Sequence, residues 1–118
     1  MAYDEKIAAR ISQILTEKGA NFFEKKMFSG VCFMVDDKMC CGTHIDKKSG
    51  ENFLLCRISP EVYEAVVGTA DCIPMDFTGR VMKGYVFVLE NGYKSKKDLG
   101  KWLQYCLDYN PIAKKSKR

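Results

Sequence analysis

The residues best suited to chemistry lie in the segment 74–85, which reads Pro-Met-Asp-Phe-Thr-Gly-Arg-Val-Met-Lys-Gly-Tyr. Asp76 is a candidate general base, but an aspartate that opens a turn usually accepts hydrogen bonds from the amides that follow it. Arg80 and Lys83 could bind a phosphate or a carboxylate, for which the planar guanidinium is well suited. The alternative is an ion pair between Arg80 and Asp76, and we favour this bracing role. A ligand-binding hypothesis for the segment includes Asp76, Thr78, Arg80, Lys83 and Tyr85.

Cysteine chemistry is a second candidate, because the chain has six cysteines and one histidine. Cys40 and Cys41 are adjacent, so on a strand they are expected to point to opposite faces, and a disulfide between them would be strained. His44, expected at the edge of a loop, does not complete a zinc site with thiols so scattered. We therefore predict reduced, mostly buried thiols, with no bound metal and no cofactor.

Positive charge is concentrated at the carboxyl end of the chain. The formal net charge is +4, and removing the last five residues leaves as many basic as acidic side chains. A nucleic-acid-binding surface would therefore need this tail or an uneven placement of lysines on the folded body. The residues of this hypothesis are Lys114, Lys115, Lys117 and Arg118 in the tail, with Lys25, Lys26, Lys94, Lys96 and Lys97 on the body.

The length of 118 residues and the 47% hydrophobic content predict one soluble domain with a single core. We assign residues 1–110 to this domain and residues 111–118 to a basic tail that is expected to be mobile. No apolar run approaches the roughly 20 residues needed to cross a bilayer, and the amino terminus has no signal-peptide pattern. The expected location is the cytoplasm, without membrane contact.

Three helices are predicted from apolar periodicity and capping residues. Apolar residues recur at helical spacing over residues 4–18, and Gly19 suits the residue that ends the helix. Ser59 followed by Pro60 starts a second helix, which ends near residue 68. Ser95 starts the third and clearest helix, which has an apolar stripe that includes Trp102 and ends at residues 110–111.

Strands are predicted between these helices. Residues 22–43 contain a β-hairpin with a short turn at Asp36 and Asp37, residues 53–58 form a mostly buried strand, and residues 85–89 form the last strand. Residues 69–84 have no clean period, so we expect a structured loop with a turn at 76–79. The predicted fold is a two-layer α+β arrangement in which helices cover one face of an antiparallel sheet, in the order α-β-β-β(-β)-α-β-α.

Three stretches together are similar to the TfoX amino-terminal-domain family: Met27 to Met34 running into Lys38 to Gly42, the strand that ends at Arg57-Ile58, and Pro74 to Arg80 followed by Met82 to Tyr85. The resemblance extends over residues 8–107 and departs from the family pattern at Ser29, Cys40 and Val81. It implies a secretion-chaperone-like α+β fold and a link to the regulation of natural competence in longer relatives. Because those regulators have a further carboxy-terminal domain, we do not expect their role to transfer directly.

Three functional hypotheses remain open at this level. The first is a non-catalytic regulatory or interaction domain that works by protein contact, also as a homodimer, with residues 76–85 as its recognition surface. The second is a nucleic-acid-binding module that uses the basic residues named above. The third is an enzyme or small-ligand protein built around Asp76, Arg80 and Lys83.

Overall fold

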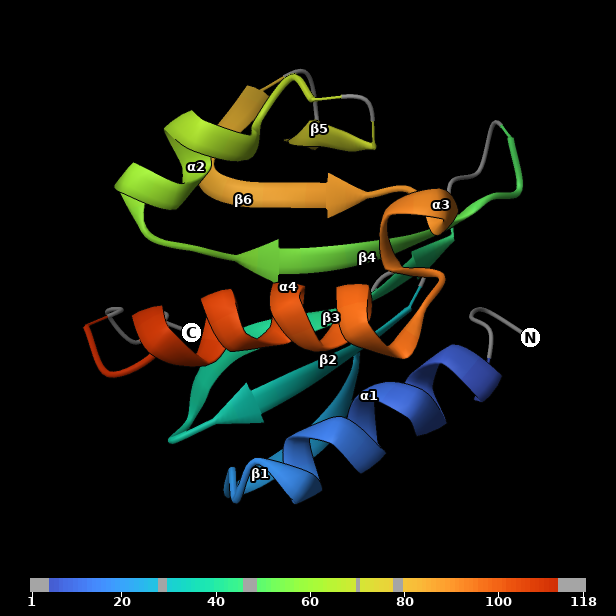
Figure 1. Ribbon diagram of the computed structural model, residues 1–118, viewed down its shortest axis with the longest axis vertical. Coiled ribbons are helices and arrows are strands. Elements are labelled where there is room, and N and C mark those ends of the chain that lie inside the picture. The colour runs from blue at the N-terminus through green and yellow to red at the C-terminus, as the bar shows by residue number, and fades with distance from the viewer. Residues whose placement is uncertain (1–4, 28–29, 46–48, 70, 78–79, 113–118) are drawn as a thin grey trace.

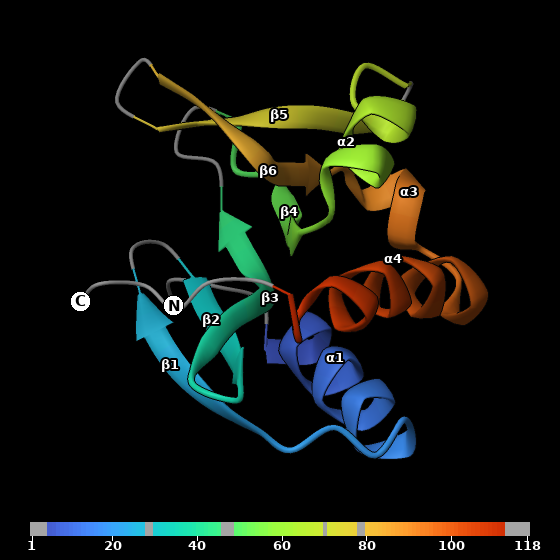
Figure 2. The same ribbon diagram turned by 90° about the vertical axis from the view of Figure 1, so that its left-hand side faces the viewer.

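The protein folds into two layers, a sheet and a layer of helices that covers one of its faces (Figures 1 and 2). The computed structural model describes residues 5–27, 30–45, 49–69, 71–77 and 80–112. The helices are α1 (Glu5–Glu17), α2 (Pro60–Val66), α3 (Glu90–Tyr93) and α4 (Lys96–Tyr109). The strands are β1 (Phe22–Met27), β2 (Gly30–Val35), β3 (Lys38–Ile45), β4 (Asn52–Arg57), β5 (Cys72–Phe77) and β6 (Arg80–Val88).

The six-stranded sheet has the order β1-β2-β3-β4-β6-β5, and each neighbouring pair is antiparallel. Helix α4 packs on the central strands β3 and β4, α1 packs beside α4 and on β3, and α2 packs on β6. The predicted two-layer α+β class is confirmed. Strand β1 forms one edge of the sheet and β5 the other.

The predicted helices form where their capping residues and apolar stripes place them. The Ser59 hydroxyl accepts a hydrogen bond from the Val62 amide at the start of α2, and the Ser95 hydroxyl accepts one from the Asp98 amide at the start of α4. Gly19 has a φ of +77° directly after α1, a conformation that glycine adopts without strain. Trp102 is buried, and its indole Nε1 donates to the Gly92 carbonyl at 3.0 Å.

Two elements were not predicted. The prediction of a structured loop over residues 69–84 is wrong, because this segment contributes to the hairpin of β5 and β6. Pro74 argues against a central strand, but β5 lies at the edge of the sheet, where a residue without an N–H is tolerated. A register shift between Pro74 and Asp76, together with the φ of +89° at Gly84, breaks the alternation that would have indicated strands.

The second missed element is α3, a short helix directly after β6, where no helix was predicted. The predicted order therefore lacked one strand and one helix. The turn between β2 and β3 is at the expected place. Asp36 and Asp37 have φ values of 54° and 63°, which aspartate adopts more readily than most residues and which suit a tight hairpin.

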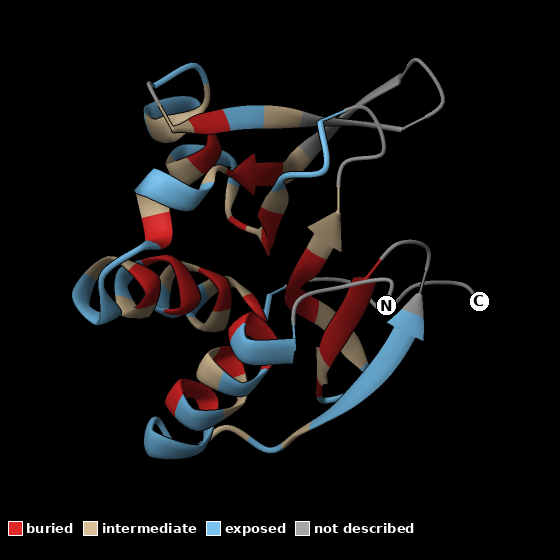
Figure 3. Cartoon of the chain, turned by 90° about the vertical axis from the view of Figure 1, so that its right-hand side faces the viewer, coloured by how far each residue is buried: buried red, intermediate tan, exposed pale blue. Residues whose placement is uncertain are grey.

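The main core lies between the sheet and the helices. Alternation along β4 and the described end of β6 sends Leu54, Cys56 and Val88 into this core and the intervening side chains to the opposite face. Phe53, Leu55 and Phe87 form a smaller apolar cluster on that second face. Figure 3 shows the buried residues along the inner side of α1 and α4, with exposed residues on their outer side.

Asn110 joins the end of α4 to the sheet. It is buried, and its Nδ2 donates to the Val35 carbonyl at 3.1 Å. The ammonium of Lys38 donates to the Asn110 carbonyl at 3.0 Å, so a β3 side chain also satisfies an end carbonyl of the helix. The residue that ends the helix therefore fixes its position on the β2–β3 hairpin.

We predict that Asn110→Ala lowers the free energy of unfolding by about 1–2 kcal/mol, because the Val35 carbonyl loses its donor inside the protein. Urea denaturation followed by circular dichroism measures this change. The matched control is Asn91→Ala, since Asn91 is exposed and should change stability by less than about 0.5 kcal/mol. Equal effects of the two substitutions would contradict the anchoring role of Asn110.

Candidate functional site

The segment that the sequence singled out lies at the hairpin of β5 and β6. In the backbone register Asp76 pairs with Val81, and Phe77 pairs with Arg80, so Asp76 and Arg80 are not direct cross-strand partners. Asp76 lies within β5 instead of opening a turn. The side chains of Asp76, Arg80 and Lys83 are outside the described parts of the structure, as is the whole of Thr78. Their bracing or ligand-binding role stays a prediction.

Tyr85 is the described side chain of this hypothesis. It is partly buried in β6 and pairs with Arg57 of β4 in the register of the sheet. The Arg57 guanidinium carbon lies 5.4 Å from the centroid of the Tyr85 ring, within the range of a cation–π contact. The contact with Arg57 already occupies part of the Tyr85 side chain, which gives Tyr85 a structural role.

The cysteines form a cluster that the sequence did not predict. The expectation that Cys40 and Cys41 point to opposite faces is wrong, because both are buried in the main core. The cause is a bulge: Phe33 pairs with Cys41 and Met34 with Met39, which leaves Cys40 as an extra residue in β3. A bulge is not visible in a pattern of alternating residues, so nothing in the sequence indicated it.

The Cys40 thiol is in hydrogen-bond contact with the thiols of Cys106 and Cys41, and Cys106 in turn contacts Cys56. Hydrogen bonds from Cys106 and Cys41 lower the pKa of Cys40, whereas the same network and burial raise the pKa of Cys41 and of Cys106. Because Cys40 is only 1% exposed, reagents in solution do not reach it in the folded state.

Metal chemistry finds no support in the described residues. All six cysteines are free and buried, and no group of three or more His, Cys, Asp or Glu side chains is placed to hold a metal ion within the described ranges. His44 lies inside β3 instead of at a loop edge. Its ring stacks on Phe87 with centroids 4.9 Å apart and an interplanar angle of 12°.

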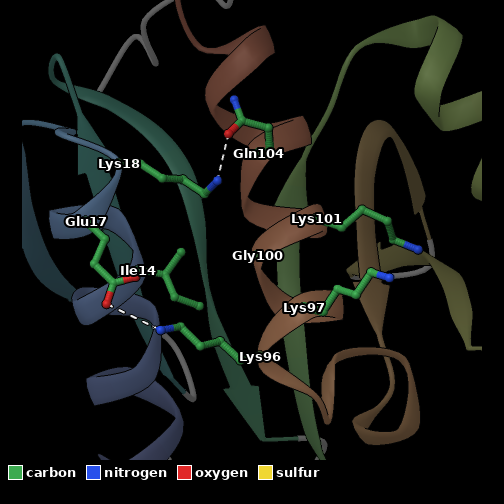
Figure 4. Close-up of a pocket in the computed structure, with 8 residues that line it drawn as sticks. All are labelled: Ile14, Glu17, Lys18, Lys96, Lys97, Gly100, Lys101 and Gln104. Carbon is green, nitrogen blue, oxygen red and sulfur yellow. Dashed lines mark hydrogen bonds and ion pairs between the residues drawn. The ribbon is translucent and has the colours of Figure 1, made fainter.

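A groove of about 590 Å³ runs between α1 and α4 (Figure 4). Its lining residues are Ile14, Glu17, Lys18, Lys96, Lys97, Gly100, Lys101 and Gln104. Lys18 Nζ donates to Gln104 Oε1 at 2.7 Å, and Lys96 Nζ lies 3.4 Å from Glu17 Oε2. Figure 4 shows these two contacts bridging the helices, with Ile14 pointing toward α4 between them. The groove therefore has an apolar floor between two polar bridges.

Gly100 lies on the α4 side of this floor. A Cβ atom added to it would have no neighbour within 4 Å, apart from its own helix and its chain neighbours. Glycine inside a helix costs roughly 0.5–1 kcal/mol relative to alanine, and packing among the described residues does not require it at this position. Gly42 is different, because a Cβ there would lie 2.5 Å from the Val31 carbonyl oxygen. The empty space beside Gly100 is thus a feature of the groove.

The groove is positively charged. Four lysines and one acid, Glu17, are among its lining residues. The bridge from Lys96 to Glu17 is exposed, with side chains 67% and 48% accessible, so it contributes about 1 kcal/mol or less. Figure 4 shows Lys97 and Lys101 directed away from α1, along the other side of α4.

The lysines of the nucleic-acid hypothesis are not all in one place. Lys96 and Lys97 line the groove, but Lys25 and Lys26 lie on β1 at the edge of the sheet, whereas α4 covers its middle. The tail residues Lys114 to Arg118 are outside the described residues.

Sequence reasoning missed Ile14 and Gly100 as site residues. The available signal was an interior glycine in the clearest predicted helix.

The fold and this site define a small α+β domain in which helices pack on one face of a six-stranded antiparallel sheet and leave a basic groove between them. The family model described as the TfoX N-terminal domain matches residues 15–109, and the chain belongs to this family. No curated protein matches the chain, and no solved structure does. Among the described residues, the helices are too short or too polar to span a membrane.

We predict that Gly100→Ala raises the free energy of unfolding by about 0.5–1 kcal/mol, because alanine favours the helix and meets no neighbouring atom. Gly42→Ala is the matched control and should lower it by about 1–3 kcal/mol, since the strands must move apart. Chemical denaturation of both variants measures these changes. Destabilisation by Gly100→Ala would show that the space beside it is filled.

We predict a loss of stability at alkaline pH that depends on Cys72. Burial raises the pKa of Cys72 from 9.0 to about 12, so the unfolded chain ionises this thiol at lower pH than the folded one does. The buried, protonated thiol contributes fully to the free energy of unfolding below pH 9. This contribution falls by about 1.4 kcal/mol per pH unit as the pH rises from 9 toward 12. Denaturation of the wild type and Cys72→Ala between pH 8 and about 10.5 measures the difference.

The control for this measurement is Val88→Ala, which truncates the buried cross-strand partner of Cys72 but removes no titrating group. The stability advantage of the wild type over Cys72→Ala should shrink above pH 9, whereas its advantage over Val88→Ala should stay constant. If both differences remain constant with pH, the raised pKa of Cys72 is refuted.

Proposed function

We propose that this TfoX N-terminal domain is a non-catalytic interaction domain that acts by contact with a protein partner, and that the groove between α1 and α4 is its contact surface. The observation that carries the proposal is the empty space beside Gly100 at the floor of that groove. A helix-destabilising residue that packing in the described part of the chain does not need favours a role in contact with another molecule. The surface differs from residues 76–85, which the sequence favoured.

Two further properties of the groove support protein contact. It combines the apolar floor at Ile14 with charged side chains at its rim, the usual arrangement of a protein-binding surface. It is also formed by two helices that the main core holds in place, since Ile11 and Leu15 of α1 and Leu99 and Leu103 of α4 are fully buried. A preformed surface of this kind binds without an ordering cost for its own backbone.

Nucleic-acid binding is the second candidate function. The lysines of the groove favour it, because Lys18 and Lys96 at its two ends attract phosphate groups. The apolar floor at Ile14 weakens the case, because a phosphate backbone has no apolar group to place there. Protein contact therefore accounts for more of the groove than nucleic-acid binding does.

Site-specific photo-crosslinking in the cells that produce the protein tests this proposal. A photoreactive amino acid replaces Glu17 in the groove, and the control replaces Glu24, an equally charged and exposed residue of β1. We predict a light-dependent, protease-sensitive adduct from position 17 and none from position 24. An adduct from position 17 that nuclease removes would support the second candidate instead. Equal labelling from both positions, or no adduct, would overturn the groove as the contact surface.

A further inference from the structure

The spacing of the groove residues carries information about the partner. Lys96, Gly100 and Gln104 are four residues apart on α4, so they form one stripe with a separation of about 6 Å between successive residues. Lys96 is bridged to Glu17 at one end of the stripe, and Gln104 is bridged to Lys18 at the other end. The groove thus presents a lysine at each end and the open space beside Gly100 in the middle.

We infer that the groove binds an acidic helical segment of a protein partner, which inserts one apolar side chain between Gly100 and Ile14. Carboxylates one helical turn before and one after this anchor pair with Lys96 and Lys18. The partner sequence is therefore an apolar residue with Asp or Glu four positions away on each side. This inference rests on the proposed function and adds the chemistry of the partner to it.

The apolar anchor follows from the floor of the groove. The Ile14 side chain points toward α4, and the position opposite it on α4 has no side chain (Figure 4). An aliphatic side chain that enters this space leaves water and contacts both helices, which is the favourable part of binding. A bare phosphate chain has no group that could use such a space.

The acidic flanks follow from the charges at the ends of the groove. Lys96 and Lys18 are both held only by exposed contacts, to Glu17 and to Gln104. A partner carboxylate replaces this weak, exposed contact with an ion pair to the lysine. The bound segment shields that ion pair from water, which strengthens it. Lys18 and Lys96 outnumber Glu17 at the ends of the groove, so the charge there also draws an acidic segment toward it.

Charge excludes one occupant from within the chain. The last five residues contain Lys114, Lys115, Lys117 and Arg118 and no acidic residue. Like charges repel this tail from a groove lined by lysines, so charge argues against the tail as the occupant.

The spacing of the groove residues is compatible with the helical form that we infer for the partner. In a helix, residues four apart lie about 6 Å apart on the same face, as Lys96, Gly100 and Gln104 do on α4. A helix laid along α4 can therefore place its anchor and both carboxylates at the three positions at once.

The test selects from a random peptide display library on the intact protein and then measures the enriched synthetic peptides by isothermal titration calorimetry. We expect enriched peptides to share an apolar residue with acidic residues four positions to each side. Gly100→Leu, which fills the space, and Lys96→Glu, which reverses one end, should each weaken binding by about tenfold or more. The control Lys26→Glu carries the same charge reversal on exposed β1 and should change affinity by less than about twofold.

A charge exchange distinguishes recognition from damage to the fold. A peptide in which lysine replaces the acidic residue that faces Lys96 should bind the Lys96→Glu variant better than it binds the wild type. The melting temperatures of all variants are measured alongside, and Gly100→Ala provides a smaller filling change if Gly100→Leu unfolds the chain. Recovery of binding by the exchanged pair would confirm the contact.

The outcomes separate this inference from the proposed function. Enriched peptides that lose binding on Gly100→Leu but contain no acidic residues would overturn the acidic partner and leave protein contact at the groove intact. Peptides whose affinity is unchanged by both groove variants, or no enrichment at all, would overturn both. Binding of a single- or double-stranded oligonucleotide that Lys96→Glu abolishes, without peptide enrichment, would replace the protein partner by nucleic acid.

Discussion

The burial of one stripe of α4 determines the rest of the helical layer. Leu99, Trp102, Leu103 and Cys106 face the sheet, and together they fix the rotation of α4 about its own axis. With that rotation fixed, the stripe at positions 96, 100 and 104 faces α1. Asn110 and Lys38 then fix the position of the helix along its axis through the end of the β2–β3 hairpin. The groove is a consequence of how the core is packed.

The same packing explains the cysteine cluster. Cys106 comes from α4, Cys56 from β4, and Cys40 and Cys41 from the bulged part of β3. Small, polarisable thiols fill the space where the helix crosses the central strands, and each finds another thiol as a weak hydrogen-bond partner. The cluster therefore belongs to the core and is separate from the groove between α1 and α4.

Local signals in the sequence were sufficient for the elements that carry their own caps and periodicity. Ser59 and Ser95 predicted the starts of two helices, and Asp36 and Asp37 predicted the position of a turn. Local signals were insufficient where pairing between distant segments determines the secondary structure. Strand β5 contains Pro74, and it is a strand only because β6 pairs with it at the edge of the sheet. The bulge at Cys40 and the relation of Gly100 to Ile14 depend on residues far apart in the chain. The groove could therefore not be predicted.

The two edges of the sheet affect how copies of this protein meet. Strand β1 has Glu24, Lys25 and Lys26 exposed in succession, and a register shift within β5 interrupts the regular spacing of its backbone. Charges and bulges at edge strands oppose the addition of a further strand from another molecule. These two edges therefore disfavour the joining of sheets from neighbouring copies into a continuous ribbon.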